Sequence, residues 1–180
     1  MAHLNKITLE SLRLLITPLN LEQLSVYKKP DALLECDLGL FKIKRKLSEE
    51  FLFTIENSAI PYIDKHPEDI LFGTLWIIIH KMTKEIIGDI GFKGKPSDKG
   101  LIEIGYGTYP EFSNQGYMTE ALGVMATWAF KQPTVRIILA DTNKENISSQ
   151  KILSKNNFSV FAETEHNYWW RLDKDVGEII

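Results

Sequence analysis

Residues 101–122, which read LIEIGYGTYPEFSNQGYMTEAL, decide the fold of this chain. The segment from Leu101 to Tyr109 is rich in β-branched and aromatic residues and is predicted to be a strand. The segment from Pro110 to Gly116 consists mainly of turn-forming residues and is predicted to be a loop. The segment from Tyr117 to Lys131 has apolar residues at helical spacing and is predicted to be a helix.

The predicted elements on either side of this stretch extend it into a sheet. Val135 to Ala140 is predicted to be a strand, so that strand, helix and strand form a βαβ unit with a parallel pair. Upstream, Ile70 to His80 and Glu85 to Phe92 are predicted to form an antiparallel meander with Leu101 to Tyr109. We therefore expect an α/β (α+β) fold whose mixed, mostly antiparallel sheet has about 6–7 strands, a central βαβ unit and flanking helices.

Both ends of the chain add further elements. Leu12 to Thr17 is predicted to be the first strand, stopped by Pro18. Three helical stretches follow it: from Asn20 to about Tyr27, from about Pro30 onward, and from Ser48 onward with an interruption at Pro61. The C-terminal part is predicted to contain a helix from Asn146 to Lys155, a strand that begins near Asn157, and a last strand from Tyr168 to Leu172.

Composition limits the class of protein. The chain has 180 residues, 44% hydrophobic and 25% charged, with a formal net charge of −3, so we expect one globular domain over residues 1–180. No apolar run reaches the roughly 18 residues of a membrane span, and the N-terminus lacks the order of a signal peptide. The single cysteine, Cys36, excludes an intramolecular disulfide and favours a cytoplasmic protein. The mild acidity argues against a general nucleic-acid binder.

The loop before the central helix has the properties of an anion site. The first N–H groups of a helix have no partner within it, and the helix dipole adds about half a positive charge there. Gly116 permits a tight turn and the close approach of a ligand, and Thr119 adds a hydroxyl. These features favour a phosphate or pyrophosphate. The alternative is an ordinary helix start capped by Ser113 or Asn114.

The familiar phosphate-binding motifs are absent. The chain contains no GxxxxGK[ST] sequence and no GxGxxG sequence, so neither a P-loop nor a dinucleotide-binding fold is indicated.

Five segments, in this order and spacing, resemble the GCN5-related N-acetyltransferase (GNAT) family. The resemblance is to the branch that contains the ribosomal-protein alanine and serine N-acetyltransferases. The segments are ESLRLLITPL at 10–19, IIGDIGF at 86–92, EIGY at 103–106, GYMTEA at 116–121, and NISS at 146–149 with Leu153, Lys155 and Phe158.

The resemblance implies a GNAT-like fold and an enzyme that transfers the acetyl group of acetyl-CoA to a primary amine by direct attack in a ternary complex. It implies that the pyrophosphate lies on the backbone of the loop and that the pantetheine arm runs along the strand before it. The residues that the resemblance assigns to the cofactor are Gly107, Thr108, Tyr109, Asn114, Gln115, Gly116, Tyr117, Met118, Thr119 and Asn146.

The loop departs from the family pattern in several places. Ser113 stands where the family usually has Gln or Arg, and Met118 stands at a position that is usually small. Asn114 and Asn157 replace frequent glycines, a change that the backbone tolerates because Asn adopts left-handed conformations more readily than most residues. Since Asn114 to Thr119 contains no Lys or Arg, we expect the site to act through backbone N–H groups.

Two side chains are candidate catalytic residues. Strand alternation places Glu103 opposite its apolar neighbours and next to the expected cleft, so it is the candidate base; the alternative is a solvent-facing carboxylate. Ser149 is the candidate to protonate or hydrogen-bond the sulfur, and the alternative is a serine that bonds the local backbone. The tyrosine that some branches use as the acid is replaced by Leu153. Tyr106 and Tyr109 are further candidates, although strand tyrosines more often pack.

The four histidines are dispersed and form no metal-binding pattern, so no metal is expected. The expected partners are acetyl-CoA and an amine acceptor, either a protein N-terminus or a small molecule, without nucleic acid or membrane. A homodimer stays open. Two other functions also remain open: a non-catalytic module that binds or senses acetyl-CoA on the same fold, and a protein-interaction domain without CoA.

Overall fold

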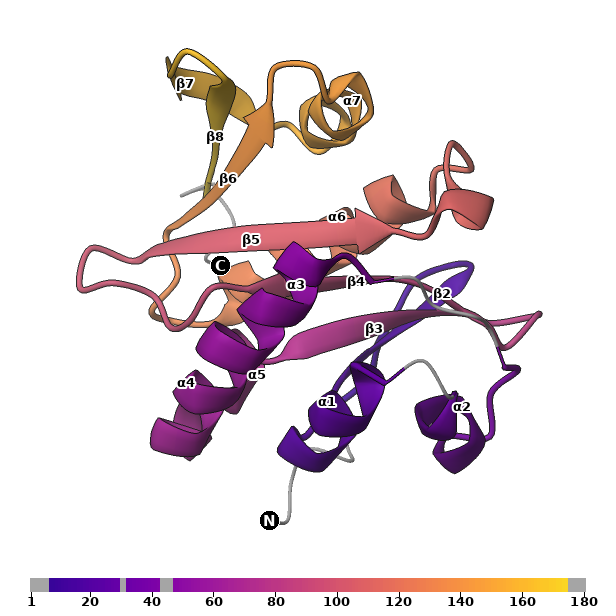
Figure 1. Ribbon diagram of the computed structural model, residues 1–180. Helices are drawn as coiled ribbons and strands as arrows, with labels where there is room; N and C mark the ends of the chain where they lie inside the picture. The colour runs from indigo at the N-terminus through magenta and orange to yellow at the C-terminus, as the bar shows by residue number, and fades with distance from the viewer. Residues whose placement is uncertain (1–6, 30–31, 43–46, 175–180) are drawn as a thin grey trace.

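The computed structural model describes residues 7–29, 32–42 and 47–174. Their core is an eight-stranded sheet in the order β1-β2-β3-β4-β5-β6-β8-β7 (Figure 1). The strands are β1 (Leu9–Glu10), β2 (Leu14–Pro18), β3 (Leu75–His80), β4 (Ile86–Phe92), β5 (Leu101–Thr108), β6 (Ile137–Asn143), β7 (Ser159–Glu163) and β8 (Asn167–Asp173). The pair β5–β6 is parallel and the other pairs are antiparallel.

This topology confirms the expected mixed sheet with its antiparallel front and its βαβ unit. The sheet has one strand more than the expected 6–7, because β1 spans only two residues and shows no periodicity in the sequence.

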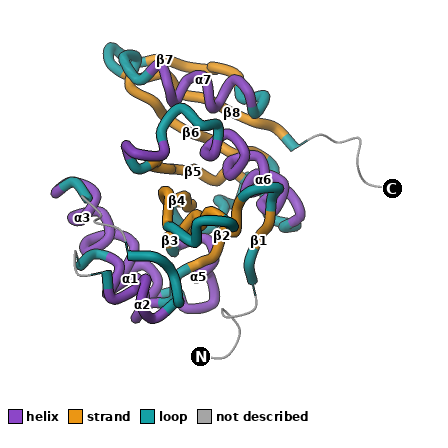
Figure 2. The backbone as a smooth tube through the Cα atoms, turned by 90° about the vertical axis from the view of Figure 1, so that its right-hand side faces the viewer, coloured by secondary structure: helices purple, strands orange, loops and turns teal. Residues whose placement is uncertain are grey.

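Helices cover both faces of the sheet. One face carries α1 (Leu21–Tyr27), α2 (Leu33–Asp37), α3 (Glu49–Thr54) and α4 (Ile60–Lys65), and the other carries α6 (Tyr117–Lys131) and α7 (Ile147–Lys155) (Figure 2). The short helix α5 (Ile70–Gly73) contributes to the cores on both faces. Within the described residues, no helix combines the length and the apolar composition that a membrane span requires.

Helix caps explain why several helices begin where they do. The Asn20 side chain accepts a hydrogen bond from the Gln23 backbone N–H at 2.8 Å, and the Gln23 side chain accepts one from Asn20 N–H at 3.0 Å. This reciprocal cap confirms the predicted start of α1. The helix predicted from Ser48 onward begins there, because the Ser48 side chain caps α3 by accepting from Phe51 N–H. The helix start expected at Pro30 lies outside the described residues.

Several predicted boundaries are wrong, among them the expected stop before Pro18, which is the last residue of β2. The strand predicted from Ile70 to His80 begins only at Leu75, because Ile70–Gly73 forms the helical turn α5. An apolar run this short has the same composition in a helix or a strand. Pro61 does not interrupt its helix either. A π-helical segment, Ile55–Ala59, directly precedes α4, and its wider turn accommodates Pro61, so that the helical run continues from α3 to α4.

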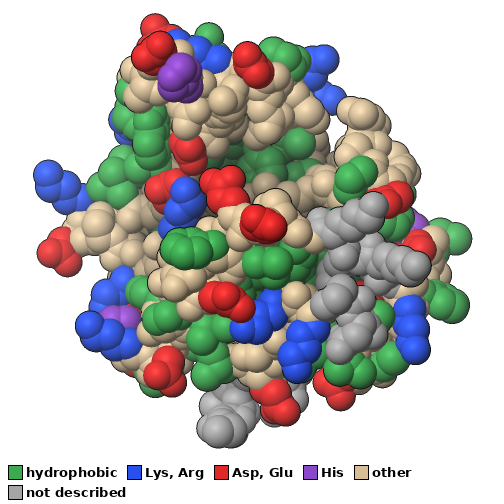
Figure 3. Space-filling model, in the orientation of Figure 1, with side chains coloured by type: hydrophobic (Ala, Val, Ile, Leu, Met, Phe, Trp, Pro, Cys, Tyr) green, Lys and Arg blue, Asp and Glu red, His purple; other side chains and the backbone are tan. Residues whose placement is uncertain are grey.

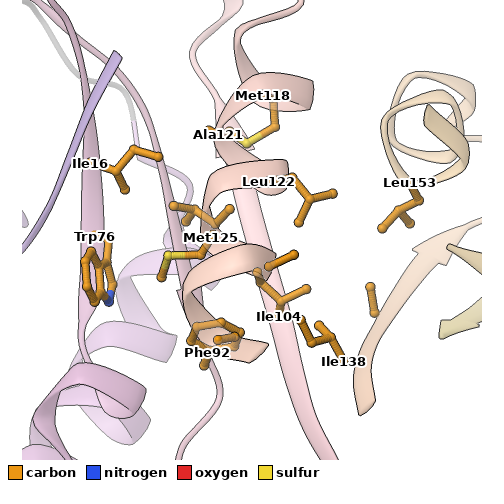
Figure 4. Packing of buried hydrophobic residues seen from close by; sticks show 14 of the residues in the cluster. Ile16, Trp76, Phe92, Ile104, Met118, Ala121, Leu122, Met125, Ile138 and Leu153 are labelled. Carbon is orange, nitrogen blue, oxygen red and sulfur yellow. The ribbon is translucent and has the colours of Figure 1, made fainter. Parts of the chain in front are cut away.

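The larger hydrophobic core lies between the sheet and α6. The inward side chains of α6 are Met118, Ala121, Leu122 and Met125 (Figure 4). They face residues of the strands and of α7, namely Ile16, Trp76, Phe92, Ile104, Ile138 and Leu153. A second core lies under α1 to α4 on the opposite face. The sheet is therefore held from both sides, and the strands that carry functional groups have fixed positions.

The parallel strands β5 and β6 separate within the sheet. Their paired residues are Leu101 with Ile137, Ile102 with Ile138 and Glu103 with Leu139, and the rest of β5 has no partner on β6. Strand β6 continues along β8 for its whole length. Figure 1 shows β6, β7 and β8 diverging from β5. The backbone of β5 beyond Glu103 is thus open on one side.

The close contact between β4 and β5 gives a stability prediction. A Cβ atom at Gly88 would lie 2.3 Å from the Gly107 backbone oxygen, whereas a Cβ atom at Gly105 would meet nothing within 4 Å. We expect Gly88→Ala to lower the free energy of unfolding by about 2–3 kcal/mol or more, because backbone atoms must move apart. The matched variant Gly105→Ala should change it by less than about 1 kcal/mol. Urea unfolding measures both, and equal destabilisation would contradict the described strand contact.

Candidate active site

A cavity of about 840 Å³ lies between the β4–β5 strands and the helical segment from α3 to α4. Its helical wall includes Phe51, Ile55, Ala59 and Tyr62. The face drawn in Figure 3 is hollowed beneath the β6–β8 strands, with hydrophobic side chains in the recess. The volume is typical of a site for a small molecule or for the end of a peptide chain.

The floor of this cavity is formed mainly by glycines. Asp89 pairs with Gly107 and Gly91 pairs with Gly105 in the β4–β5 ladder, and all four residues line the cavity. Side chains alternate between the faces of a strand, so these positions share the face toward the helices. Three of them have no side chain, and this absence makes the hollow. Asp89 is the one side chain that these four positions contribute.

Asp89 is a buried carboxylate in contact with the cavity. Its exposed fraction is 5%, and its Oδ2 atom accepts a hydrogen bond from the Tyr27 hydroxyl at 3.0 Å. The Tyr109 hydroxyl forms a hydrogen bond with the Tyr27 hydroxyl. Burial raises the pKa of Asp89 from 3.8 to about 7, and the bond from Tyr27 limits the rise. Near neutral pH this group therefore exchanges protons readily.

The sequence reading did not single out Asp89. The available signal was its place inside the apolar strand IIGDIGF, where no other residue is charged. A lone acid in a strand that is buried along its length requires a reason, since burying an unpaired charge is costly.

A second cavity, of about 330 Å³, lies on the other face of the sheet between the loop before α6 and the helix α7. Thr108, at the end of β5, lines both cavities. The two cavities thus approach each other from opposite faces at the point where β5 and β6 have separated.

The loop before α6 turns its backbone toward the second cavity. Asn114 and Gly116 have positive φ angles of 60° and 79°, and no side chain caps the first N–H groups of α6. Alternating left-handed residues of this kind direct successive N–H groups to one side, as in anion-binding nests. The expected left-handed conformation of Asn114 is confirmed, and Asn157 also has a positive φ of 62°.

Arg13, from the loop before β2, holds this loop in place. Its Nε atom lies 2.7 Å from Glu120 Oε2 in α6, and its Nη1 atom donates to the Gln115 backbone oxygen at 3.1 Å. The guanidinium also lies 4.4 Å from the centre of the Tyr117 ring. These bonds join the segment before β2 to the start of α6 and so support the loop conformation that the structure shows.

Two lysines of α7 add positive charge to the second cavity. Lys151 and Lys155 line it together with Ile147, Ser148 and Ile152. The loop itself has no Lys or Arg, and the expectation that it acts through backbone N–H groups stays a prediction, to which these two side chains add nearby positive charge. The sequence does contain a signal for these lysines. Ile147, Lys151 and Lys155 are four residues apart, and this spacing places all three on one face of a helix.

The predicted cofactor residues divide into three groups. Those that line the second cavity are Thr108, Asn114, Gly116, Tyr117, Met118 and Thr119. Gly107, Thr108 and Tyr109 line the first cavity. Gln115 and Asn146 line neither. The Gln115 side chain donates to the Glu111 backbone oxygen, and the Asn146 side chain caps α7 by accepting from Ser149 N–H at 3.0 Å.

Glu103 forms an ion pair with Lys93, which also lies 3.6 Å from Asp141. Burial alone would lower the pKa of Lys93, but these two carboxylates raise it. Lys93 lines the first cavity and Glu103 does not. The predicted role of Glu103 as a base stays a prediction, in a setting where its charge is already paired.

Ser149 lies next to the separated strands. Its hydroxyl is 2.9 Å from the Tyr106 hydroxyl, so that α7 and β5 are joined across the opening. Burial raises the pKa of Tyr106 to about 12, while the Ser149 bond lowers it slightly, and Tyr106 therefore keeps its proton at neutral pH. Leu153, in the position of the family's tyrosine, is fully buried in the core.

One group of residues in the described part of the chain has the composition of a metal site. His66, Glu68 and Asp69 have potential ligand atoms within 4.8 Å of one another. Asp69 already pairs with Lys95 at 3.4 Å, and His66 with Glu68 at 3.7 Å. None of the three lines either cavity.

Comparison with known proteins finds one family model, described as the acetyltransferase (GNAT) domain, that matches residues 12–159. The uncharacterized N-acetyltransferase YjdG of Bacillus subtilis is 38% identical over 95 residues, which are 52% of this chain and 56% of that protein. A second curated relative, YoaA of the same organism, is matched over 59% of its length, so the matches span little more than half of these two relatives.

Solved structures share the fold. The ribosomal-protein-S5-alanine acetyltransferase of Vibrio fischeri superposes with a TM-score of 0.68 at 17% identity, covering 95% of this chain and 98% of that one. A RimL ribosomal L7/L12 α-N-protein acetyltransferase, solved in complex with coenzyme A, superposes with a TM-score of 0.67 at 14% identity, covering 94% and 99%.

The buried carboxylate gives a prediction for stability. Because the folded state raises the pKa of Asp89 from 3.8 to about 7, folding holds a proton there that the unfolded chain releases. This contribution to stability is present below about pH 4, is lost as the pH rises to about 7, and is then constant. Asp89→Asn removes the titration and retains an acceptor for Tyr27. Its stability relative to the parent should rise by roughly 3–5 kcal/mol between about pH 4 and pH 8.

Urea unfolding of both proteins at several pH values measures this difference, in which the contributions of all other carboxylates cancel. A difference that does not change with pH would show that Asp89 ionises in the folded protein as it does in the unfolded chain.

Proposed function

The chain belongs to the acetyltransferase (GNAT) domain family, and we propose that it transfers the acetyl group of acetyl-CoA to a primary amine by direct attack in a ternary complex. The observation that carries this proposal is the pair of cavities on opposite faces of the sheet, which approach each other at Thr108. One cavity suits an anionic cofactor and the other suits an acceptor. A thioester that passes between them would meet the amine at the opening beside β5.

The second cavity supports the cofactor end of the proposal. The pyrophosphate would accept hydrogen bonds from the backbone between Asn114 and Thr119, at the positive end of the α6 dipole. Lys151 and Lys155 would add charge–charge attraction from α7. They take over the role of the Gln or Arg that Ser113 replaces. The pantetheine arm would run along Gly107 to Tyr109, whose strand is open beyond Glu103.

The chemistry of the reaction requires three functions from the site. The amine must be neutral when it attacks, the oxyanion needs an N–H donor, and the departing sulfur needs a proton. Tyr106 and Ser149 are proposed for the sulfur, because their hydroxyls are bonded to each other beside the opening and both retain their protons. Glu103 remains the base proposed from the sequence, and Asp89 in the cavity floor is a second candidate for this role.

The acceptor is proposed to be a protein N-terminus or a small-molecule amine. The cavity of about 840 Å³ has room for either, and its helical wall is largely apolar. One solved structure with this fold is named an α-N-protein acetyltransferase, which makes a peptide N-terminus the first acceptor to test. We also propose a cytoplasmic location, on the basis of the single cysteine. A homodimer stays open, as it did from the sequence.

The proposal is tested by following CoA release from acetyl-CoA with a thiol reagent, in the presence of peptides, polyamines and small amines. At least one amine should accelerate release strongly. Gly105→Leu is the variant that tests the cavity, because a Cβ atom there meets nothing within 4 Å and the larger side chain would occupy cavity space. It should abolish amine-dependent release and leave acetyl-CoA binding within about 3-fold of the parent.

Tight binding of acetyl-CoA, measured by calorimetry, without turnover on any amine would instead identify a binding or sensing module. The absence of both binding and turnover would leave the acetyl-CoA proposal without support.

The charge of α7 gives a separate prediction. Lys151→Ala and Lys155→Ala should each weaken acetyl-CoA binding by roughly 3- to 10-fold, and the loss should shrink at high salt because exposed charges are screened. Lys99→Ala, an exposed lysine in the turn before β5, is the control and should bind as the parent does. Calorimetry at two ionic strengths provides the comparison. Equal binding by all three variants would remove α7 from the cofactor site.

A further inference from the structure

We propose that Asp89 accepts the proton of the acceptor amine and that Tyr27 positions its carboxylate for this step. The inference rests on the proposed acetyl transfer and names a catalytic residue for it. The carboxylate expected from the sequence, Glu103, does not line the acceptor cavity, whereas Asp89 lies in its floor.

The β4–β5 ladder places Asp89 beside the site of reaction. Asp89 is paired directly with Gly107, so the Cβ positions of the two residues are about 5 Å apart. A Cβ atom at Gly107 would lie 3.6 Å from Asp89 Oδ1, and the glycine leaves that space empty. Gly107 is one of the residues proposed to lie along the pantetheine arm. An amine that approaches the thioester from the cavity would therefore pass next to Oδ1.

The carboxylate has one oxygen available for this amine. Oδ2 accepts the hydrogen bond from Tyr27, and this is the one hydrogen bond of the Asp89 side chain among the described residues. An ionised carboxylate offers about four acceptor positions. Oδ1 can thus accept a proton from the amine nitrogen while Oδ2 stays bound to Tyr27.

The charge of Asp89 is not required by the packing around it. An asparagine would accept the same bond from Tyr27 and would avoid the cost of burying a carboxylate. A group that lowers stability and lies in the floor of a cavity is a candidate for function, because proteins retain such groups mainly at sites of chemistry.

The surrounding groups leave Asp89 able to ionise near neutral pH. The titratable groups that face it are Tyr27 from α1 and Tyr109 after β5. Tyr62 and Lys93 line the same cavity. The charge of Lys93 is paired with Glu103 and Asp141 and is not directed at Asp89. Burial therefore dominates and holds the pKa of Asp89 at about 7, where a general base is effective.

The proton balance of the proposed step is complete. The amine nitrogen forms a bond to the thioester carbonyl carbon, and its proton passes to Asp89 Oδ1. The carbon–sulfur bond then breaks, and the sulfur takes a proton from solvent, either directly or through the Tyr106–Ser149 pair, which then regains its proton from solvent, to give CoA. Asp89 returns its proton to solvent through the cavity, and the products are the N-acetyl amine and free CoA.

The test uses the best amine from the release assay and measures kcat/KM between about pH 5 and pH 9. The parent should show a low-pH limb with an inflection near pH 7. Asp89→Asn should lose this limb and fall about 100-fold or more in kcat/KM, with acetyl-CoA binding unchanged. Tyr27→Phe should remain active, with its inflection moved to higher pH, because the bond that favours the carboxylate is gone. Asp98→Asn, an exposed carboxylate in a turn, is the control and should match the parent.

The outcomes separate this inference from the proposed function. If the parent transfers acetyl and Asp89→Asn keeps its rate and its low-pH limb, the role of Asp89 is overturned and acetyl transfer stands. Loss of the limb in Glu103→Gln alone would give the base role to Glu103 and would also overturn the inference. If the parent releases no CoA with any amine, the proposed function fails and the base role fails with it.

Discussion

The separation of β5 from β6 is the constraint on which the rest of the site depends. The two strands share three residue pairs. Beyond them, β6 is paired only with β8, and the remainder of β5 is paired only with β4. The hydroxyl pair of Tyr106 and Ser149 joins β5 to α7 across the opening. A continuous sheet would isolate its two faces from each other. The opening instead allows a ligand on the α6 face to reach a ligand on the α1–α4 face.

Residue alternation along β5 gives its two faces opposite properties. Ile102 and Ile104 are buried against α6 and anchor the strand in the core. Gly105 and Gly107 point the other way and leave a hollow above Asp89. The core on one face therefore supplies the rigidity that a glycine-rich strand lacks, and the cavity on the other face keeps its shape without side chains of its own.

The sequence correctly predicted the elements whose apolar residues recur over several turns and whose ends are marked by a turn-forming residue. The helix Tyr117–Lys131 has the predicted limits, since its apolar positions recur over four turns and Gly116 marks its start. The first part of the run from Ile70 to His80 was wrongly predicted to be a strand, because the apolar stretch before Thr74 is too short to show either a helical or a strand period. For the site, local motifs located the loop between Asn114 and Thr119. They could not locate Lys151, Lys155 or Asp89, because these residues reach the cavities only through the packing of α7 beside α6 and of the α3–α4 segment over β4 and β5.

The glycine floor also determines how this cavity can change over evolutionary time. Among the floor glycines, a Cβ atom at Gly91 would lie 2.9 Å from the Thr74 backbone oxygen, and one at Gly107 would lie 3.6 Å from Asp89 Oδ1. Gly105 has open space above it. A single substitution at this position can therefore shorten or reshape the acceptor cavity while the sheet stays intact. Position 105 is thus a place where a chain of this fold could acquire a new acceptor range without first acquiring a new scaffold.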